Sequence, residues 1–183
     1  TCVTWGPDEK YVYIAVLNRD QDHMKMNKYD VSTGELVKTL FEEKNEHYVE
    51  PEDDLVFLNK EKDKFIWVSE RDGYRHLYLF NTEGELIRQL TSGEWVVRSF
   101  LGIDPKDQYA FFTATKESPL NSDVFSVNLK NGDIKKISNK NGTHRAILNE
   151  NGKYYLDIFS DTTTMRDYTV MSTKCKELHV LKD

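Results

Sequence analysis

Cysteine, proline and net positive charge are all scarce in this sequence of 183 residues. Its two cysteines, Cys2 and Cys175, lie near opposite ends, a separation that forms neither a disulfide framework nor a metal site. The sequence leaves open whether the two cysteines pair with each other and in which cellular compartment the protein lies. Acidic residues number 31 against 25 lysines and arginines, so the net charge is −6. Because a phosphate-binding surface needs clustered basic residues in excess, we expect no nucleic-acid binding.

A long hydrophobic run is also missing. The longest clean one, Tyr11 to Leu17, is far shorter than the roughly 20 residues of a membrane-spanning helix, so we predict no membrane segment. Residues Thr1 to Trp5 lack the charged and apolar regions of a signal peptide and are typical of a strand. We therefore expect the sequence to begin inside a longer protein. No stretch keeps the i, i+3, i+4, i+7 spacing of a helix.

The residues that are abundant favour sheet, and they recur in a repeat. Aromatic residues make up 12 % of the chain, and together with many β-branched residues they suit half-buried pleated strands. A set of four strands restarts in the same order, and its copies close at Leu40, Leu90, Ile137 and Leu181. In the second copy we expect residues 65–68 as the second strand, with Phe65 or Trp67 packed between sheets, and residues 76–80 as the third strand. These residues lie 50, 47 and 44 positions apart, and a four-stranded propeller blade takes roughly 40 to 50 residues.

We therefore predict an all-β fold, a β-propeller fragment of about four four-stranded antiparallel blades, with approximate bounds 1–43, 44–93, 94–139 and 140–183. A β-sandwich also has many short strands, but it has neither this period nor a strand set that restarts in one order. Four dipeptides fall between expected strands, where we expect tight hairpins with both residues at positive φ. They are Asp72-Gly73, Asn131-Gly132, Asn141-Gly142 and Asn151-Gly152.

A resemblance makes the prediction more specific. Residues 67–78 read Trp-Val-Ser-Glu-Arg-Asp-Gly-Tyr-Arg-His-Leu-Tyr. This segment resembles the link between the second and third strands of one propeller blade in dipeptidyl peptidase IV-like members of the prolyl oligopeptidase family, bacterial members included. Further stretches resemble the same propeller in the same order, at 17–21, 48–51, 90–95, 118–120, 142–144 and 154–157. The resemblance thus runs nearly from end to end.

The resemblance implies that the chain belongs to a larger serine exopeptidase. An eight-bladed propeller would precede an α/β-hydrolase domain with a Ser-Asp-His triad, which removes Xaa-Pro or Xaa-Ala dipeptides from peptide N-termini. The propeller would admit the peptide substrate and form part of the pocket for its N-terminus. The partners of this chain would be the remaining blades, the hydrolase domain and peptide substrates, in the periplasm, at the cell surface or outside the cell.

The sequence lacks the catalytic residues of such an enzyme. No Gly-x-Ser-x-Gly motif occurs, and Ser92-Gly93, the nearest approach, lies in a turn with no helix after it. We predict no catalytic residue here, and a hydrolase domain that is absent from this chain. The five histidines have no metal-ligand spacing, so we predict neither a metal nor a cofactor.

Candidate substrate contacts follow from position in the resemblance alone. The stretch 48–51 corresponds to one that, in mammalian relatives, carries a Phe-Arg pair before a proline and borders the second subsite of the pocket. Only Pro51 matches, since Val49 and Glu50 replace the aromatic residue and the cation. Val49 and Glu50 are therefore the candidate substrate-binding residues.

Two polar clusters are assigned to structure instead. The family binds the amino group of its substrate with two adjacent glutamates, but that pair lies in an earlier blade. Here Glu42-Glu43 follows the end of an expected strand, so we predict a solvated loop. The second cluster, Ser69, Glu70, Arg71 and Asp72, precedes a turn that Asp72 and Gly73 form. We expect Arg71 or Arg75 to pair with a nearby carboxylate and fix this loop.

Two other functions stay open, a free-standing β-propeller that binds proteins and the propeller of another prolyl-oligopeptidase-type enzyme, such as an acylaminoacyl peptidase. An arc of four blades also leaves two apolar sheet faces bare, near Tyr11–Val16 and Tyr154–Phe159. Because bare apolar area of this kind is rare on soluble monomers, we expect self-association through the end blades.

Overall fold

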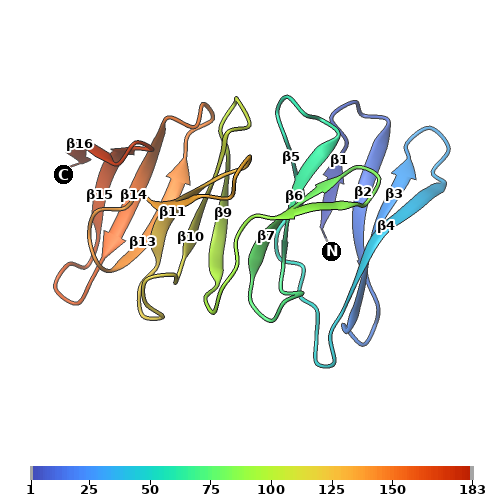
Figure 1. Ribbon diagram of the computed structural model, residues 1–183, viewed down its shortest axis with the longest axis horizontal. Coiled ribbons are helices and arrows are strands. Elements are labelled where there is room, and N and C mark those ends of the chain that lie inside the picture. Colours follow the sequence, from blue (N-terminus) through green and yellow to red (C-terminus); the bar gives the residue numbers. More distant parts are fainter. Residues whose placement is uncertain (1, 182–183) are drawn as a thin grey trace. The chain divides into compact units, whose positions relative to one another are not determined.

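The chain folds entirely into strands, turns and loops. Figure 1 shows its computed structural model, which describes residues 2–181. These residues form sixteen strands and contain no helix, and therefore none that could cross a membrane. The strands make four four-stranded antiparallel sheets, each from four consecutive strands paired in sequence order. The predicted all-β fold of four four-stranded blades is confirmed.

The sheets divide between two compact units, and the first unit, blue to green in Figure 1, holds two of them. Its first sheet contains β1 (Val3–Trp5), β2 (Tyr11–Leu17), β3 (His23–Asp30) and β4 (Leu36–Lys44). Its second sheet contains β5 (Val56–Phe57), β6 (Lys64–Ser69), β7 (His76–Asn81) and β8 (Leu86–Gln89).

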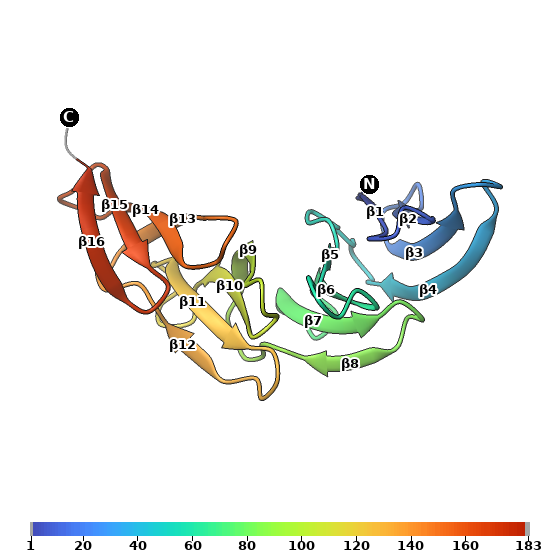
Figure 2. The same cartoon turned by 90° about the horizontal axis from the view of Figure 1, so that it is seen from above.

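The second unit, yellow-green to red, holds the other two sheets. One contains β9 (Val97–Ile103), β10 (Tyr109–Ala114), β11 (Asp123–Asn128) and β12 (Ile134–Lys136). The other contains β13 (Thr143–Leu148), β14 (Tyr154–Ser160), β15 (Asp167–Ser172) and β16 (Lys176–Leu181). Figure 2 shows the strands of this last sheet side by side in sequence order.

Aromatic side chains fill the space between the two sheets of the first unit. Alternation along β2 turns Tyr13 inward, where its ring meets Phe57 edge-on with centroids 5.2 Å apart. Phe80 stacks on both Phe41 and Phe65, at 4.5 and 5.7 Å. Phe65 and Trp67 are 0 % and 1 % exposed on β6, the second strand of its sheet. This confirms the prediction that the strand lies second in a blade and packs between sheets.

A close backbone approach also joins these two sheets. Gly84 lies in the turn between β7 and β8 with φ +87°, in the left-handed region that glycine adopts without strain. A Cβ at this position would overlap the carbonyl group of Leu40 on β4. The turn therefore packs directly against the neighbouring sheet because residue 84 has no side chain.

The second unit has its own core between its two sheets. It consists of Phe111, Val124, Ile137, Ala146, Tyr155 and Met171. The hydroxyl of Tyr155 donates to the carbonyl of Ile137 at 3.1 Å, so the buried phenol keeps a partner. Burial raises the pKa of Tyr155 above its usual range.

The expected turn dipeptides lie between strands, but with a different backbone. Gly73, Gly132, Gly142 and Gly152 all have positive φ, whereas the residue before each of them does not. The prediction of two positive-φ residues in each turn is therefore wrong. The asparagine side chains stabilise the loops instead, since Asn131 Oδ1 accepts from the backbone N–H of Asp133 at 3.1 Å. Local sequence favoured a turn without determining its type.

Candidate functional site

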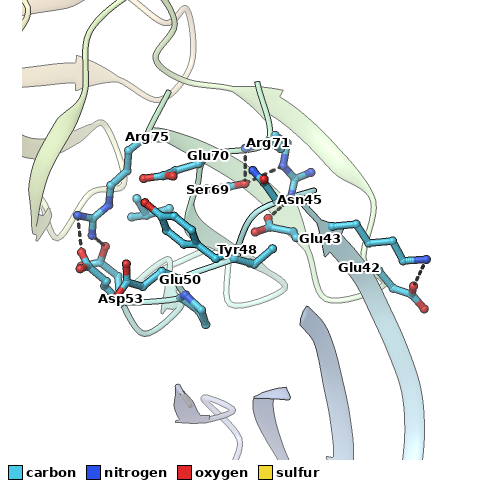
Figure 3. Close-up of a pocket in the computed structure, with 15 residues that line it drawn as sticks. Glu42, Glu43, Asn45, Tyr48, Glu50, Asp53, Ser69, Glu70, Arg71 and Arg75 are labelled. Carbon is cyan, nitrogen blue, oxygen red and sulfur yellow. Dashed lines mark hydrogen bonds and ion pairs between the residues drawn. The ribbon is translucent and has the colours of Figure 1, made fainter. Parts of the chain in front are cut away.

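A cavity of about 270 Å³ lies in the first unit, where β4 and β6 end (Figure 3). One wall is the end of β4 and the loop after it, up to Asp53. The other wall is the end of β6 and the turn toward β7, including Glu70, Arg71 and Arg75. Residues from both sheets of this unit therefore line the cavity, and the 48–51 stretch forms part of that lining.

The loop after β4 is attached to the rest of the unit by its backbone. The N–H of Val49 donates to the carbonyl of Gln21 at 2.6 Å, in the turn between β2 and β3. The Asn45 N–H similarly donates to the Asp22 carbonyl at 3.0 Å. On the far side, the thiol of Cys2 donates to the Pro51 carbonyl at 3.2 Å. Three contacts thus position the candidate residues of the loop.

Glu43 is a structural carboxylate at the base of the cavity. Its Oε1 accepts from Trp67 Nε1 at 3.0 Å and from the guanidinium of Arg71, and its side chain is only 10 % exposed. Glu43 belongs to β4, opposite Met24 on β3. The predicted solvated loop at Glu42-Glu43 is therefore wrong, because β4 continues through both residues.

Glu42 lies on the other side of the same strand and contacts one histidine and two lysines. His23 Nε2 lies 2.7 Å from its Oε2, and the ammonium groups of Lys25 and Lys44 lie 3.6 Å from its carboxylate. The hydrogen bond from His23 in particular holds the pKa of Glu42 below its usual range. Both glutamates are thus occupied by residues of this chain.

Arg71 closes the core beneath the cavity. Its guanidinium lies over the rings of Phe41, Tyr78 and Phe80, at 5.5, 4.9 and 5.0 Å from their centroids. Its Nε also donates to Ser69 Oγ at 3.1 Å. One cation therefore links a carboxylate, a hydroxyl and an aromatic cluster.

Arg75 fixes the opposite rim of the cavity. It pairs with Glu52 at 2.7 Å and with Asp53, both in the loop after β4. The prediction that Arg71 or Arg75 pairs with a nearby carboxylate is confirmed for both arginines.

Two carboxylates of the cavity are left without a cation. Glu50 and Glu70 are exposed, and within residues 2–181 neither forms an ion pair. Figure 3 shows Glu50 and Glu70 with Tyr48, whose side chain is 57 % exposed, in the same lining. The cavity can therefore bind a cationic group through free carboxylates beside an aromatic ring.

The structure places the candidate residues at this cavity and adds others. Val49 is half-buried, packs against the aromatic core and holds the loop, while Glu50 is exposed in the lining. Their contact with substrate stays a prediction. Glu70 was grouped with the architectural residues, although the side chains of Ser69, Arg71 and Asp72 have partners here and its own does not. Glu70 is recognised as a candidate site residue only because its side chain, unlike those of its neighbours, has no partner in the described part of the chain.

A histidine–aspartate pair in the second unit has a structural role. His144 Nδ1 lies 2.8 Å from both carboxylate oxygens of Asp157, and its Nε2 lies 3.1 Å from the Lys140 carbonyl. A triad histidine presents its second nitrogen to a nucleophilic hydroxyl, and here a carbonyl occupies that position. The pair therefore fixes β13 to β14 and activates no serine.

The chain matches known proteins along most of its length. Residues 1–166 match the model of the family described as the dipeptidyl peptidase IV N-terminal region. A crystal structure of a candidate dipeptidyl aminopeptidase IV from Bacteroides ovatus is similar over the whole chain, with 36 % identity and a TM-score of 0.90. Dipeptidyl peptidase 4 of Porphyromonas gingivalis is similar over 99 % of it, with 29 % identity and a TM-score of 0.89.

Curated relatives match over shorter segments. Dipeptidyl peptidase 4 of the fungus Arthroderma otae is 36 % identical over 67 residues, which is 37 % of this chain and 9 % of that protein. The chain spans 29 % of the Bacteroides structure and 26 % of the Porphyromonas structure.

The four consecutive sheets and these similarities define the chain as an all-β propeller segment of the kind found in large peptidases. It belongs to the dipeptidyl peptidase IV N-terminal region family. The resemblance drawn from residues 67–78 and the stretches around them is confirmed.

Proposed function

We propose that this chain is the non-catalytic propeller segment of a dipeptidyl peptidase IV-like serine exopeptidase. The whole protein would release Xaa-Pro or Xaa-Ala dipeptides from peptide N-termini. Family membership and the much longer dipeptidyl peptidase relatives support this proposal. Since the sequence has no Gly-x-Ser-x-Gly motif, hydrolysis would come from an α/β-hydrolase domain outside these residues.

The propeller segment would admit the peptide and hold the part of it near the N-terminus. The observation that carries this role is the free carboxylate of Glu50 in a cavity whose other acidic side chains, apart from Glu70, are paired. Val49 would form the apolar part of the same wall. Because Glu50 stands where mammalian relatives carry a cation, the site would favour substrates with Lys or Arg as the first residue.

The test compares substrates that differ in their first residue, using the full-length protein. Glu50→Gln should lower kcat/KM for a Lys-Pro substrate about fivefold to tenfold, roughly the energy of one charge-assisted hydrogen bond, and leave Ala-Pro unchanged. Glu46→Gln is the control, since Glu46 is exposed on the same loop outside the cavity lining. An equal loss on both substrates would contradict the role of Glu50. Absence of dipeptide release by the unaltered protein would contradict the function as a whole.

A further inference from the structure

A second hollow, of about 390 Å³, lies within the second unit between its two sheets. Its polar lining comes from β9, β10, the loop before β11 and the start of β13, and consists of Arg98, Ser99, Thr113, Asn121, Ser122, Thr143, His144 and Arg145. Backbone contacts hold the loop before β11 against the start of β13. The His144 N–H donates to the Ser122 carbonyl at 2.7 Å, and Ser122 pairs with Thr143 in a parallel bridge.

The charge of this hollow is opposite to that of the chain. The chain carries −6, yet two arginines line the hollow and no aspartate or glutamate does. His144 also lines the hollow, and its ring is buried against the carboxylate of Asp157. A locally positive concave surface on an acidic protein attracts anions and repels cations.

The polar side chains of the lining have capacity for a ligand. Within residues 2–181, Arg145 forms no ion pair, and its side chain is exposed. The side chains of Ser99, Asn121, Ser122 and Thr143 likewise make no hydrogen bond to the described part of the chain. A guanidinium binds a carboxylate through two parallel hydrogen bonds, and hydroxyl and amide donors can complete the shell.

The surrounding backbone favours a peptide as the source of the anion. β9 and β13 are each the first strand of their sheet, with β10 and β14 as their only neighbouring strands in the described part of the chain. Ser122 already occupies the edge of β13 at Thr143 and His144, so that edge is available only beyond these two residues. Both strands contribute lining residues to the hollow. Edge strands carry unpaired N–H and C=O groups, to which an extended peptide can bond.

We propose that this hollow binds an acidic peptide, with the guanidinium of Arg145 holding a side-chain carboxylate and the hydroxyls of Ser122 and Thr143 donating to it. This site is separate from the cavity of the first unit, and it does not depend on the activity proposed above.

The test uses the full-length protein and an N-acetylated, C-amidated Gly-Asp-Asp-Gly peptide, whose blocked amino group makes it a poor ligand for an N-terminus site. Isothermal titration at low ionic strength should show a Kd at least about tenfold lower than for the matched Gly-Asn-Asn-Gly peptide. Arg145→Gln should raise the Kd for the acidic peptide about tenfold. Arg166→Gln, at an exposed arginine outside the hollow, should leave it unchanged.

Three outcomes would overturn the proposal. Equal affinity for the two peptides would show that the side-chain carboxylates do not contribute to binding. An unaltered Kd in Arg145→Gln, with a native circular dichroism spectrum, would show that Arg145 does not contribute to binding. Inorganic phosphate that binds through Arg145 while the acidic peptide does not would make this an anion site without peptide recognition. Arg145→Lys should recover part of the affinity, because it keeps the charge and loses the planar fork.

Discussion

Arg71 lies between the aromatic core of the first unit and its cavity, and its contacts exceed those expected from the sequence. Local pattern predicted an arginine that fixes a turn, and its bond to Ser69 agrees with that. The rings of Phe41, Tyr78 and Phe80 beneath it come from other strands and could not be assigned from spacing along the chain. The residue therefore stabilises the packing between two sheets as well as one loop.

Arg71→Ala should lower the free energy of unfolding by about 1 to 3 kcal/mol, because it leaves the nearly buried carboxylate of Glu43 with Trp67 as its remaining partner. Urea denaturation followed by tryptophan fluorescence measures the change. Arg88→Ala is the matched control, since Arg88 is exposed on β8, and it should shift the midpoint little. Equal shifts in the two variants would show that the Glu43 pair contributes nothing measurable.

At the scale of the elements, two turns with similar glycine conformations differ in their contacts: the turn at Gly84 packs against a neighbouring sheet, and the turn at Gly34 does not. Gly34 and Gly84 have similar positive φ, +73° and +87°, but a Cβ at Gly34 would meet open space. Gly34→Ala should cost about 1 kcal/mol from the backbone conformation alone. Gly84→Ala should cost at least about 1 kcal/mol more, because the turn must also move off β4. Thermal unfolding of both variants measures the difference, and equal losses would contradict the close approach.

Most strands could be predicted because their determinants are local. Alternation and aromatic content identified 65–68 and 76–80, which lie in β6 and β7, and the 44-to-50-residue period identified the sheets. The end of β4 was missed because Glu42 and Glu43 are acidic, and only their pairing with β3 shows that they are strand.

The candidate site was predicted less completely, because its residues come together through contacts that the local sequence pattern does not show. Position in the family pattern led to Val49 and Glu50, and both line the cavity. Glu70 lies across the cavity on another strand end, so no spacing rule connects it with Glu50. His144 and Asp157 lie on the paired strands β13 and β14, and no spacing rule connected them either.

At the scale of the whole molecule, the two outermost sheets in the sequence both expose apolar side chains. On the first sheet Val3, Trp5 and Val16 are 50, 60 and 40 % exposed, while Tyr13 faces the core. On the last sheet Ile147 and Tyr154 are 54 and 43 % exposed. Of these exposed residues only Val16 and Tyr154 lie on the strands for which bare apolar area was predicted, whereas Val3, Trp5 and Ile147 lie on the first strands of the same two sheets.

The 183-residue chain on its own should therefore self-associate. Burial of several hundred Å² at roughly 25 cal/mol per Å² offsets much of the entropy lost on association. Light scattering over a concentration series should show a rising mean mass, and Trp5→Lys should reduce that rise. A monomer at every concentration would contradict the prediction. The full-length protein is the control, since its further blades should cover these faces.

Each sheet is built from one continuous stretch of chain, and this has a consequence for how the protein forms. Among the strand pairs of residues 2–181, the widest separation is that of His23 and Lys44, which are 21 positions apart. Short-range pairing of this kind needs little loop closure, so hydrogen bonding within a sheet can begin while later residues are still being synthesised. Only side-chain packing must then await the following sheet, and the nascent chain should acquire protease resistance in steps of one sheet.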